Sequence, residues 1–167
     1  MKKLNSKEIR DYLYQSYAKV DGLWFVKVEE KFGFDKSLEI DREVWGIMPK
    51  IQARLLKSKL GLTDGIDTLF ECLKIKLKLD NFKFKAKKTC IPEAKNSSII
   101  ITINHCPWHD LLVKSNRDKV SGKVGSTICQ VEYSTFSQEF GKDMNFELKD
   151  QLCKGSDFCK FIFTEQN

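Results

Sequence analysis

The sequence has no long apolar run and no recognisable leader segment. Its longest uninterrupted apolar stretches are a handful of residues, such as Ile99–Ile101, whereas a helix that spans a bilayer needs roughly 20. The charges at the N-terminus are followed by further polar residues instead of an apolar core and a cleavage site. We therefore expect a cytoplasmic protein with no membrane partner.

The motifs of several large enzyme classes are also missing. The chain contains no Gly-rich phosphate loop, no paired-histidine metal motif, no nucleophile elbow and no segment that repeats at a fixed period. Only 9 Gly and 3 Pro occur among 167 residues of which 41% are hydrophobic, which argues against a disordered or fibrous chain. The composition indicates one globular protein without a familiar nucleotide site.

Arginine is scarce although the formal net charge is +6. The densest basic run, residues 83–88, alternates lysine with apolar residues and predicts a strand with a solvated basic face. Because bidentate phosphate recognition favours arginine, we do not expect a nucleic acid partner.

Apolar residues recur at helical spacing through the first half of the chain. Asn5 and Glu8 have the spacing of a capping box, and the pattern after them predicts a helix that ends near Gly33. A second helix is expected from about Asp35 to Gly61, kinked at Pro49. Its predicted buried stripe is Leu38, Trp45, Met48, Ile51 and Leu55. A third helix should run from residue 63 or 64 to about 78.

From Asp80 the apolar period changes to two, which indicates strands. Two paired strands, a short helix from Pro107, a loop over 121–126, a helix over 127–140 and a closing hairpin are expected. The fold class is α+β: an N-terminal helical lobe (1–78) and a four-stranded antiparallel sheet packed by helices (79–167), forming one compact unit.

Cysteine is the residue type that calls for a chemical explanation. Four of the six cysteines, Cys106, Cys129, Cys153 and Cys159, lie in the last third of the chain. Thiolates from several elements of one domain could hold a zinc ion tetrahedrally, so we predict a zinc site with these four ligands. A redox-active thiol pair and plain structural thiols are the alternatives, since Cys129 and Cys159 also fit apolar faces.

Both histidines lie beside the first of these cysteines. His109 is an alternative fourth ligand, whereas His105 shares a strand face with isoleucines and is expected to be buried. Cys106 precedes a predicted helix, where a helix N-terminus favours the thiolate, so it is the candidate nucleophile if the protein is an enzyme.

A second set of residues could bind a small ligand. Asp21, Trp24, Trp45 and Arg54 offer aromatic walls with one acid and one guanidinium, as a pocket for a polar or carboxylated molecule would. The charged members could instead be solvated or form an interhelical ion pair. The long helices could also supply a homodimer face.

Two blocks of sequence resemble known families. Residues 21–25, 38–45 and Ala53-Arg54 resemble the N-terminal block of a family of uncharacterised prokaryotic cytosolic proteins. Cys106-Pro107, Cys129 and residues 155–161 resemble the vinyl-4-reductase-type domain and, more loosely, the aminothiazoline-carboxylate hydrolase-like family.

The first resemblance implies a small-molecule-binding or sensor module, with a tetrapyrrole-like molecule among the possible ligands and a metal- or redox-capable cysteine cluster. The looser one implies a cysteine- or metal-dependent hydrolase. No Rossmann or flavin motif accompanies these residues, so a reductase would need an external electron donor.

Overall fold

The computed structural model describes residues 3–91 and 96–165. Its helices are α1 (Ser6–Phe32), α2 (Phe34–Trp45), α3 (Met48–Leu60), α4 (Ile66–Leu79), α5 (Pro107–Lys114) and α6 (Asp118–Gln138), with a short 3-10 turn η2 (Leu152–Lys154). Its strands are β1 (Lys83–Ile91), β2 (Asn96–His105), β3 (Met144–Leu148) and β4 (Cys159–Glu165). The α+β prediction is confirmed.

The chain divides into two compact units, Met1–Glu43 and Val44–Asn167. Helices α3 and α4 belong to the second unit, together with the whole sheet. The sequence-based division into 1–78 and 79–167 stays a prediction. In the part of the chain that is described, no helix is both long and apolar enough to cross a membrane.

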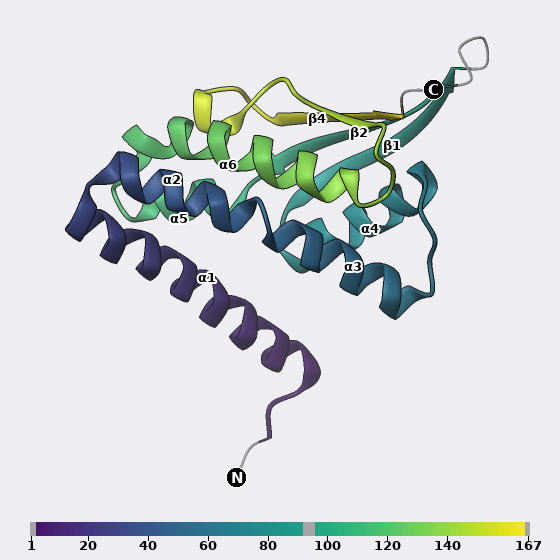
Figure 1. Cartoon of the computed structure of the whole chain (residues 1–167). Helices are drawn as coiled ribbons and strands as arrows, with labels where there is room; N and C mark the ends of the chain where they lie inside the picture. The colour runs from purple at the N-terminus through teal and green to yellow at the C-terminus, as the bar shows by residue number, and fades with distance from the viewer. Residues whose placement is uncertain (1–2, 92–95, 166–167) are drawn as a thin grey trace. The chain divides into compact units, whose positions relative to one another are not determined.

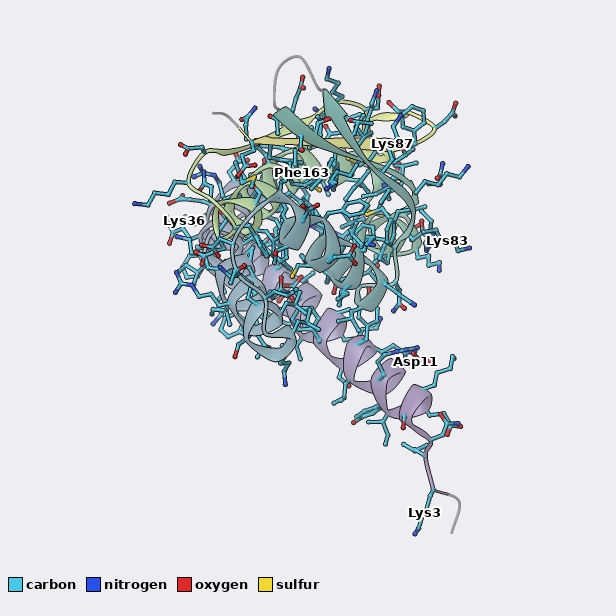
Figure 2. All side chains as sticks on the ribbon, turned by 90° about the vertical axis from the view of Figure 1, so that its right-hand side faces the viewer. Lys3, Asp11, Lys36, Lys83, Lys87 and Phe163 are labelled. Carbon is cyan, nitrogen blue, oxygen red and sulfur yellow. The ribbon has the colours of Figure 1, made fainter. Side chains whose placement is uncertain are left out.

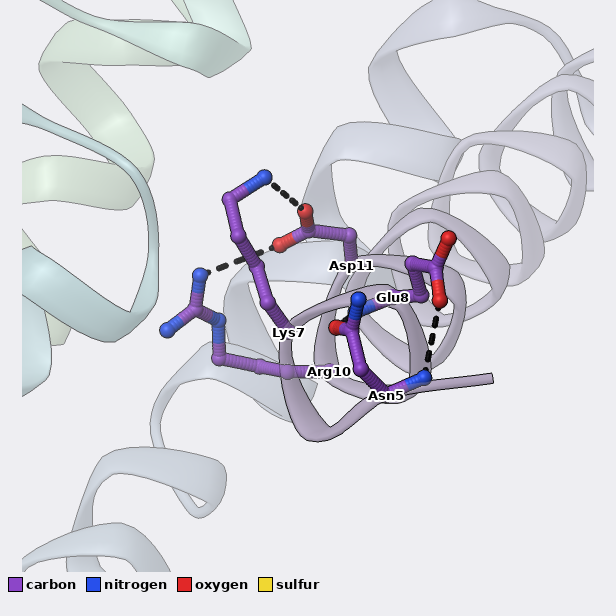
Figure 3. Close-up of polar contacts among 5 residues, drawn as sticks. All are labelled: Asn5, Lys7, Glu8, Arg10 and Asp11. Carbon is purple, nitrogen blue, oxygen red and sulfur yellow. Dashed lines mark hydrogen bonds and ion pairs between the residues drawn. The ribbon is translucent and has the colours of Figure 1, made fainter. Parts of the chain in front are cut away.

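The first unit begins with the predicted capping box. The amide of Glu8 donates to Oδ1 of Asn5 at 3.0 Å, and the amide of Asn5 donates to Oε2 of Glu8 at 2.8 Å (Figure 3). Two amides of the first helical turn, which have no partner inside the helix, are thereby satisfied. The helix then runs without a break to Gly33. The Gly33 amide still donates a hydrogen bond to the Glu29 carbonyl oxygen, and its φ of 83° ends the helix.

The single kinked helix predicted over 35–61 is wrong. The structure has two helices, α2 and α3, and Pro49 is the second residue of α3, where its missing amide leaves no hydrogen bond unmade. Helix α3 buries Pro49 and Ala53. Ile51 and Leu55, which were expected in the buried stripe, are exposed.

The four strands of the second unit form one antiparallel sheet in the order β1-β2-β4-β3. Within this unit α4 and α6 lie on the same side of the sheet (Figure 1). Alternate residues of each strand face these helices, so that Ile101 lies opposite Phe161 and Phe146 opposite Phe163, all buried. The core thus lies between one face of the sheet and the helices.

The basic run occupies the edge strand β1. Lys83, Lys85 and Lys87 are exposed, and Figure 2 shows Lys83 and Lys87 at the surface while Phe163 lies inside. Lys88, on the other face of the strand, pairs with Asp67 of α4. Lysines on an edge strand discourage pairing with other chains.

The loop predicted over 121–126 is also wrong, since α6 begins at Asp118 and runs through it. Gly122 and Gly125 lie inside the helix, although glycine lowers helix stability. Both face the turn that carries Cys153 and leave room for it. The glycines therefore serve packing, not chain reversal.

Candidate functional site

The four predicted metal ligands lie on four elements of the second unit. Cys106 is the N-cap of α5, Cys129 lies in α6, Cys153 in η2, and Cys159 begins β4. The pKa of the Cys129 thiol is raised well above its usual value, first by burial and then by negative charge on Cys106, Glu132, Cys159 and Cys153. We call these four residues the thiol cluster, as a name for the predicted ligand set; their convergence on one metal ion stays a prediction.

Two members of the thiol cluster receive backbone amides. The amide of Leu152 donates to Sγ of Cys159 at 3.2 Å. The amides of His109 and Trp108, at the start of α5, act on Cys106 and lower its pKa, but burial outweighs them and raises that pKa to about 12. The sequence-based expectation of a helix-activated thiolate at Cys106 therefore does not hold, because desolvation disfavours the charged form more than the helix end favours it.

The seat of Cys153 is built from the two glycines of α6. A Cβ atom added at Gly125 would lie 2.6 Å from Sγ of Cys153, and one added at Gly122 would lie 3.0 Å from the Cys153 carbonyl oxygen. Any larger residue at Gly125 would push the thiol out of its position. The helix surface is thus shaped to hold Cys153 beside Cys129.

The side chains of the thiol cluster are not arranged as a coordination sphere. Across 3–91 and 96–165, no three His, Cys, Asp or Glu side chains are disposed to hold a metal ion. The donor set is nevertheless the one that zinc prefers, namely four sulfur atoms from separate elements. Each cysteine can turn its thiol about a single side-chain torsion, so a small local change alters their mutual distances.

Both histidines have a polar partner. His105, the last residue of β2, is partly exposed instead of buried, and its Nδ1 atom lies 3.2 Å from Oδ2 of Asp110. Nδ1 of His109 lies 2.8 Å from the Ser121 hydroxyl. A hydrogen bond at Nδ1 leaves Nε2 able to bind a metal, so His109 stays the alternative fourth ligand.

Sequence reasoning missed a buried charged network next to the thiol cluster. Nζ of Lys76 lies 2.8 Å from a carboxylate oxygen of Asp80 and 2.8 Å from one of Glu132, and the Lys76 side chain is only 3% exposed. The pKa of Lys76 is raised because the two carboxylates outweigh the desolvation of the ammonium group. The available signal was the position of Lys76 three residues after Leu73, on the apolar side of its helix.

The predicted ligand-binding residues are divided between the two units. Asp21 and Trp24 lie on α1 in the first unit, where burial raises the pKa of Asp21 and Trp24 is 69% exposed. Trp45 and Arg54 lie in the second unit. The convergence of these four residues on one ligand stays a prediction.

Within the second unit both ligand candidates have partners. Arg54 forms two hydrogen bonds with the carboxylate of Glu139, the C-cap of α6, at 2.7 and 3.0 Å. Trp45 packs edge-on against Trp108, with ring centroids 6.2 Å apart and an interplanar angle of 77°. Trp108 follows Cys106 by two residues, so the Trp45 ring is linked to the thiol cluster through α5.

Sequence comparison places the protein in a family. The family of unknown function DUF6125 matches residues 4–161. The chain belongs to this family. The match spans both blocks that were recognised separately in the sequence, so the DUF6125 unit includes the N-terminal helices and the thiol cluster together. The resemblance to the vinyl-4-reductase-type domain stays a prediction.

Comparison with other proteins adds little to this DUF6125 assignment. No curated protein matches the chain. Among solved structures, the phenol-responsive sensory domain of the transcription activator PoxR, with phenol, is similar with a TM-score of 0.48 and 9% identity. The similarity covers 89% of this chain and 73% of that one. Because the TM-score is below 0.5, we base no inference on this similarity.

Proposed function

We propose that this DUF6125 protein is a small-molecule-binding or sensor module whose second unit holds a zinc ion with Cys106, Cys129, Cys153 and Cys159. What supports the proposal is the location of the four residues on neighbouring elements of the second unit. Cys106 and Cys129 pack against the core that contains Cys159, and Cys153 contacts α6 at Gly125, one turn before Cys129.

The electrostatics of the thiol cluster would make metal binding depend on pH, because the metal must displace the thiol protons. Burial raises the pKa of each of the four thiols, and negative charge on other cysteines of the set raises those of Cys106, Cys129 and Cys159 further, so all four are uncharged at neutral pH without a metal. A divalent cation reverses this balance, since it deprotonates the thiols that bind it. When bound, zinc would cross-link the β2–α5 junction, α6, η2 and β4, which is a structural role.

The sensing part of the proposal rests on the aromatic link to the cluster. A ligand that contacts Trp45 would act on Trp108, and through α5 on Cys106. The predicted ligand is a small organic molecule, possible candidates being acids that pair with Arg54 and tetrapyrrole-like compounds. We further propose that the protein is cytoplasmic. Homodimer formation and a hydrolase activity are additional hypotheses.

Metal analysis of protein purified without added metal tests the site. We expect about one equivalent of zinc per chain, as a closed four-sulfur site binds. The Cys106→Ser and Cys153→Ser variants should lose it. Less than about a tenth of an equivalent of any transition metal in the unsubstituted protein would refute the zinc proposal.

Cys72 provides the matched control. It is a fully buried thiol of α4, and its pKa is raised by burial and affected by Lys57 and Glu71, with none of the four cysteines of the cluster among the causes. Cys72→Ala should therefore leave the zinc content unchanged. Loss of zinc in this variant would mean that the assay reports loss of folding.

The binding of a ligand is tested separately by tryptophan fluorescence of the zinc-loaded protein during titration with small carboxylic acids and with a tetrapyrrole. A ligand at Trp45 should change the emission in the unsubstituted protein and not in Trp45→Phe. If neither titration changes the emission and native mass spectrometry detects no adduct, the binding function is wrong while the metal site can still be correct.

A further inference from the structure

Helix α1 carries a row of apolar side chains that is exposed along most of its length. We call this row the α1 stripe, and its members are Ile9, Leu13, Tyr17, Val20, Trp24 and Val28. Ile9, Leu13, Val20 and Trp24 are 46%, 59%, 58% and 69% exposed. None of the residues of α1 is buried. Since helices in proteins are stabilised mainly by packing an apolar face, this face needs a cover.

The α1 stripe does not point at the other helix of its own unit. The contact between α1 and α2 includes an edge-on pair of rings, Phe25 and Phe34, whose centroids lie 5.9 Å apart. Phe25 directly follows Trp24, and successive residues of a helix point about 100° apart. The stripe therefore lies outside this contact and stays available to a partner.

The exposed apolar area has the size of a protein interface. Together with Tyr12 and Leu23 at its side, the α1 stripe exposes the equivalent of about four large side chains, or about 800 Å² at roughly 200 Å² each. The largest apolar patch on a typical monomer covers about 300–600 Å². Each partner of a stable complex contributes about 800 Å².

The spacing of the α1 stripe reads the same in both directions, since its six members follow one another at steps of four, four, three, four and four residues. An antiparallel second copy, related by a two-fold axis between positions 18 and 19, therefore sets stripe residue against stripe residue. Ile9 then lies opposite Val28, Leu13 opposite Trp24, and Tyr17 opposite Val20. Such self-complementarity is what a two-fold interface requires, and rows at a spacing of four are the ridges that pack most often between helices.

The charges near the α1 stripe permit this pairing. Arg10 and Lys27 also face each other across the axis, but Arg10 lies 3.2 Å from the Asp11 carboxylate (Figure 3) and Lys27 lies 2.7 Å from that of Glu30. Residues 1–43 contain nine basic and nine acidic residues and thus no net charge. Two copies of this unit do not repel each other as wholes. The unit also lacks the basic excess that holds amphipathic helices on anionic membranes.

We propose that the α1 stripe is the homodimer interface, and that it binds the same stripe of a second copy in antiparallel orientation. This inference rests on the homodimer hypothesis stated above and assigns a surface and a register to it. It requires neither the zinc site nor a small ligand.

The test is sedimentation velocity of the full chain, with a chelator present, at concentrations from about 1 to 100 μM, where weak interfaces of this size dissociate. The unsubstituted protein should form a dimer. Leu13→Glu and Trp24→Lys should each raise the dimer Kd by roughly 100-fold or more, because each buries unpaired charges at the interface. Combining the two substitutions should recover at least about tenfold, since each introduced acid then faces an introduced base of the second copy. The two positions lie about 16 Å apart along one helix, so they cannot compensate each other within a chain.

Ile51→Glu is the matched control, because Ile51 is an equally exposed apolar residue on α3 in the second unit. It should leave the dimer Kd unchanged, and circular dichroism should show that all variants keep their helices. A monomer at every concentration would overturn the inference, and so would a dimer that only Ile51→Glu dissociates. A double variant no better than the single ones would refute the antiparallel register. A monomer that floats with vesicles of anionic phospholipid would assign the stripe to a membrane surface instead. None of these results would affect the zinc proposal.

Discussion

Replacing Gly125 with alanine places a methyl carbon 2.6 Å from the Sγ atom of Cys153. In the interior of a helix, a change from glycine to alanine alone stabilises by up to about 1 kcal/mol. Overpacking a filled site costs about 1–3 kcal/mol. We therefore expect Gly125→Ala to lower the free energy of unfolding by about 1 kcal/mol, because the steric cost exceeds the gain in helix propensity.

Removing the Cys153 thiol should abolish that steric cost. The next nearest atom to the added methyl is Cβ of Cys153 at 3.5 Å, which is an ordinary contact. In the Cys153→Ala background, Gly125→Ala should thus become stabilising. The double-mutant cycle should give a coupling energy of about 2 kcal/mol, within the range seen for residues in contact.

Gly122 distinguishes this explanation from a general sensitivity of α6. An alanine there meets the Cys153 carbonyl oxygen at 3.0 Å, and Cys153→Ala keeps that oxygen. The cost of Gly122→Ala should therefore persist in the Cys153→Ala background.

Urea unfolding followed by tryptophan fluorescence, with a reducing agent and a chelator present, measures all five variants. Trp45 and Trp108 both lie in the second unit, so their emission reports its unfolding. If the changes in unfolding free energy for Gly125→Ala and Cys153→Ala are additive to within about 0.5 kcal/mol, the two residues are not in contact and the described packing of Cys153 against α6 is wrong.

Two further predictions concern other parts of the chain. Lys76→Met should lower the free energy of unfolding by about 3–5 kcal/mol, because it leaves the carboxylates of Glu132 and Asp80 without their cation. In the same urea assay, Lys85→Met on the exposed edge strand should change it by no more than about 0.5 kcal/mol. Since the folded pKa of Lys76 is raised, its contribution is present below about pH 10 and is lost as pH rises further, so the parent and not Lys76→Met should show this alkaline loss. Asn5→Ala should weaken the start of α1 by about 1 kcal/mol, measured as faster amide exchange in its first turn, and unchanged exchange would contradict the capping box.

The fold could be predicted where local chemistry decides it. The capping box at Asn5, the stop at Gly33 and the change of apolar period near Asp80 each depend on neighbouring residues, and each prediction is confirmed. Gly122 and Gly125 were misread because a glycine that makes room for Cys153 and a glycine that breaks a helix look the same in one sequence. Pro49 was misread for a similar reason, since the effect of a proline depends on its distance from the helix start.

The candidate site could be predicted in composition and not in detail. The four cysteines were recognisable because thiols concentrated in one part of the chain are unusual, whereas their convergence on one metal ion stays a prediction. The high pKa of Cys106 could not be foreseen, because it depends on burial that only the tertiary fold provides. The Lys76 network needed the pairing of α4 with α6, which no local pattern specifies.

The order of the strands has a consequence for synthesis on the ribosome. β4 lies between β2 and β3, so the last strand of the sheet is also a central one. Until residue 165 has been made, the isoleucine-rich strand β2 has no partner on the edge that later pairs with β4. β3 lacks the same partner. The second unit therefore cannot close as it emerges, and the nascent chain exposes an apolar edge that molecular chaperones recognise.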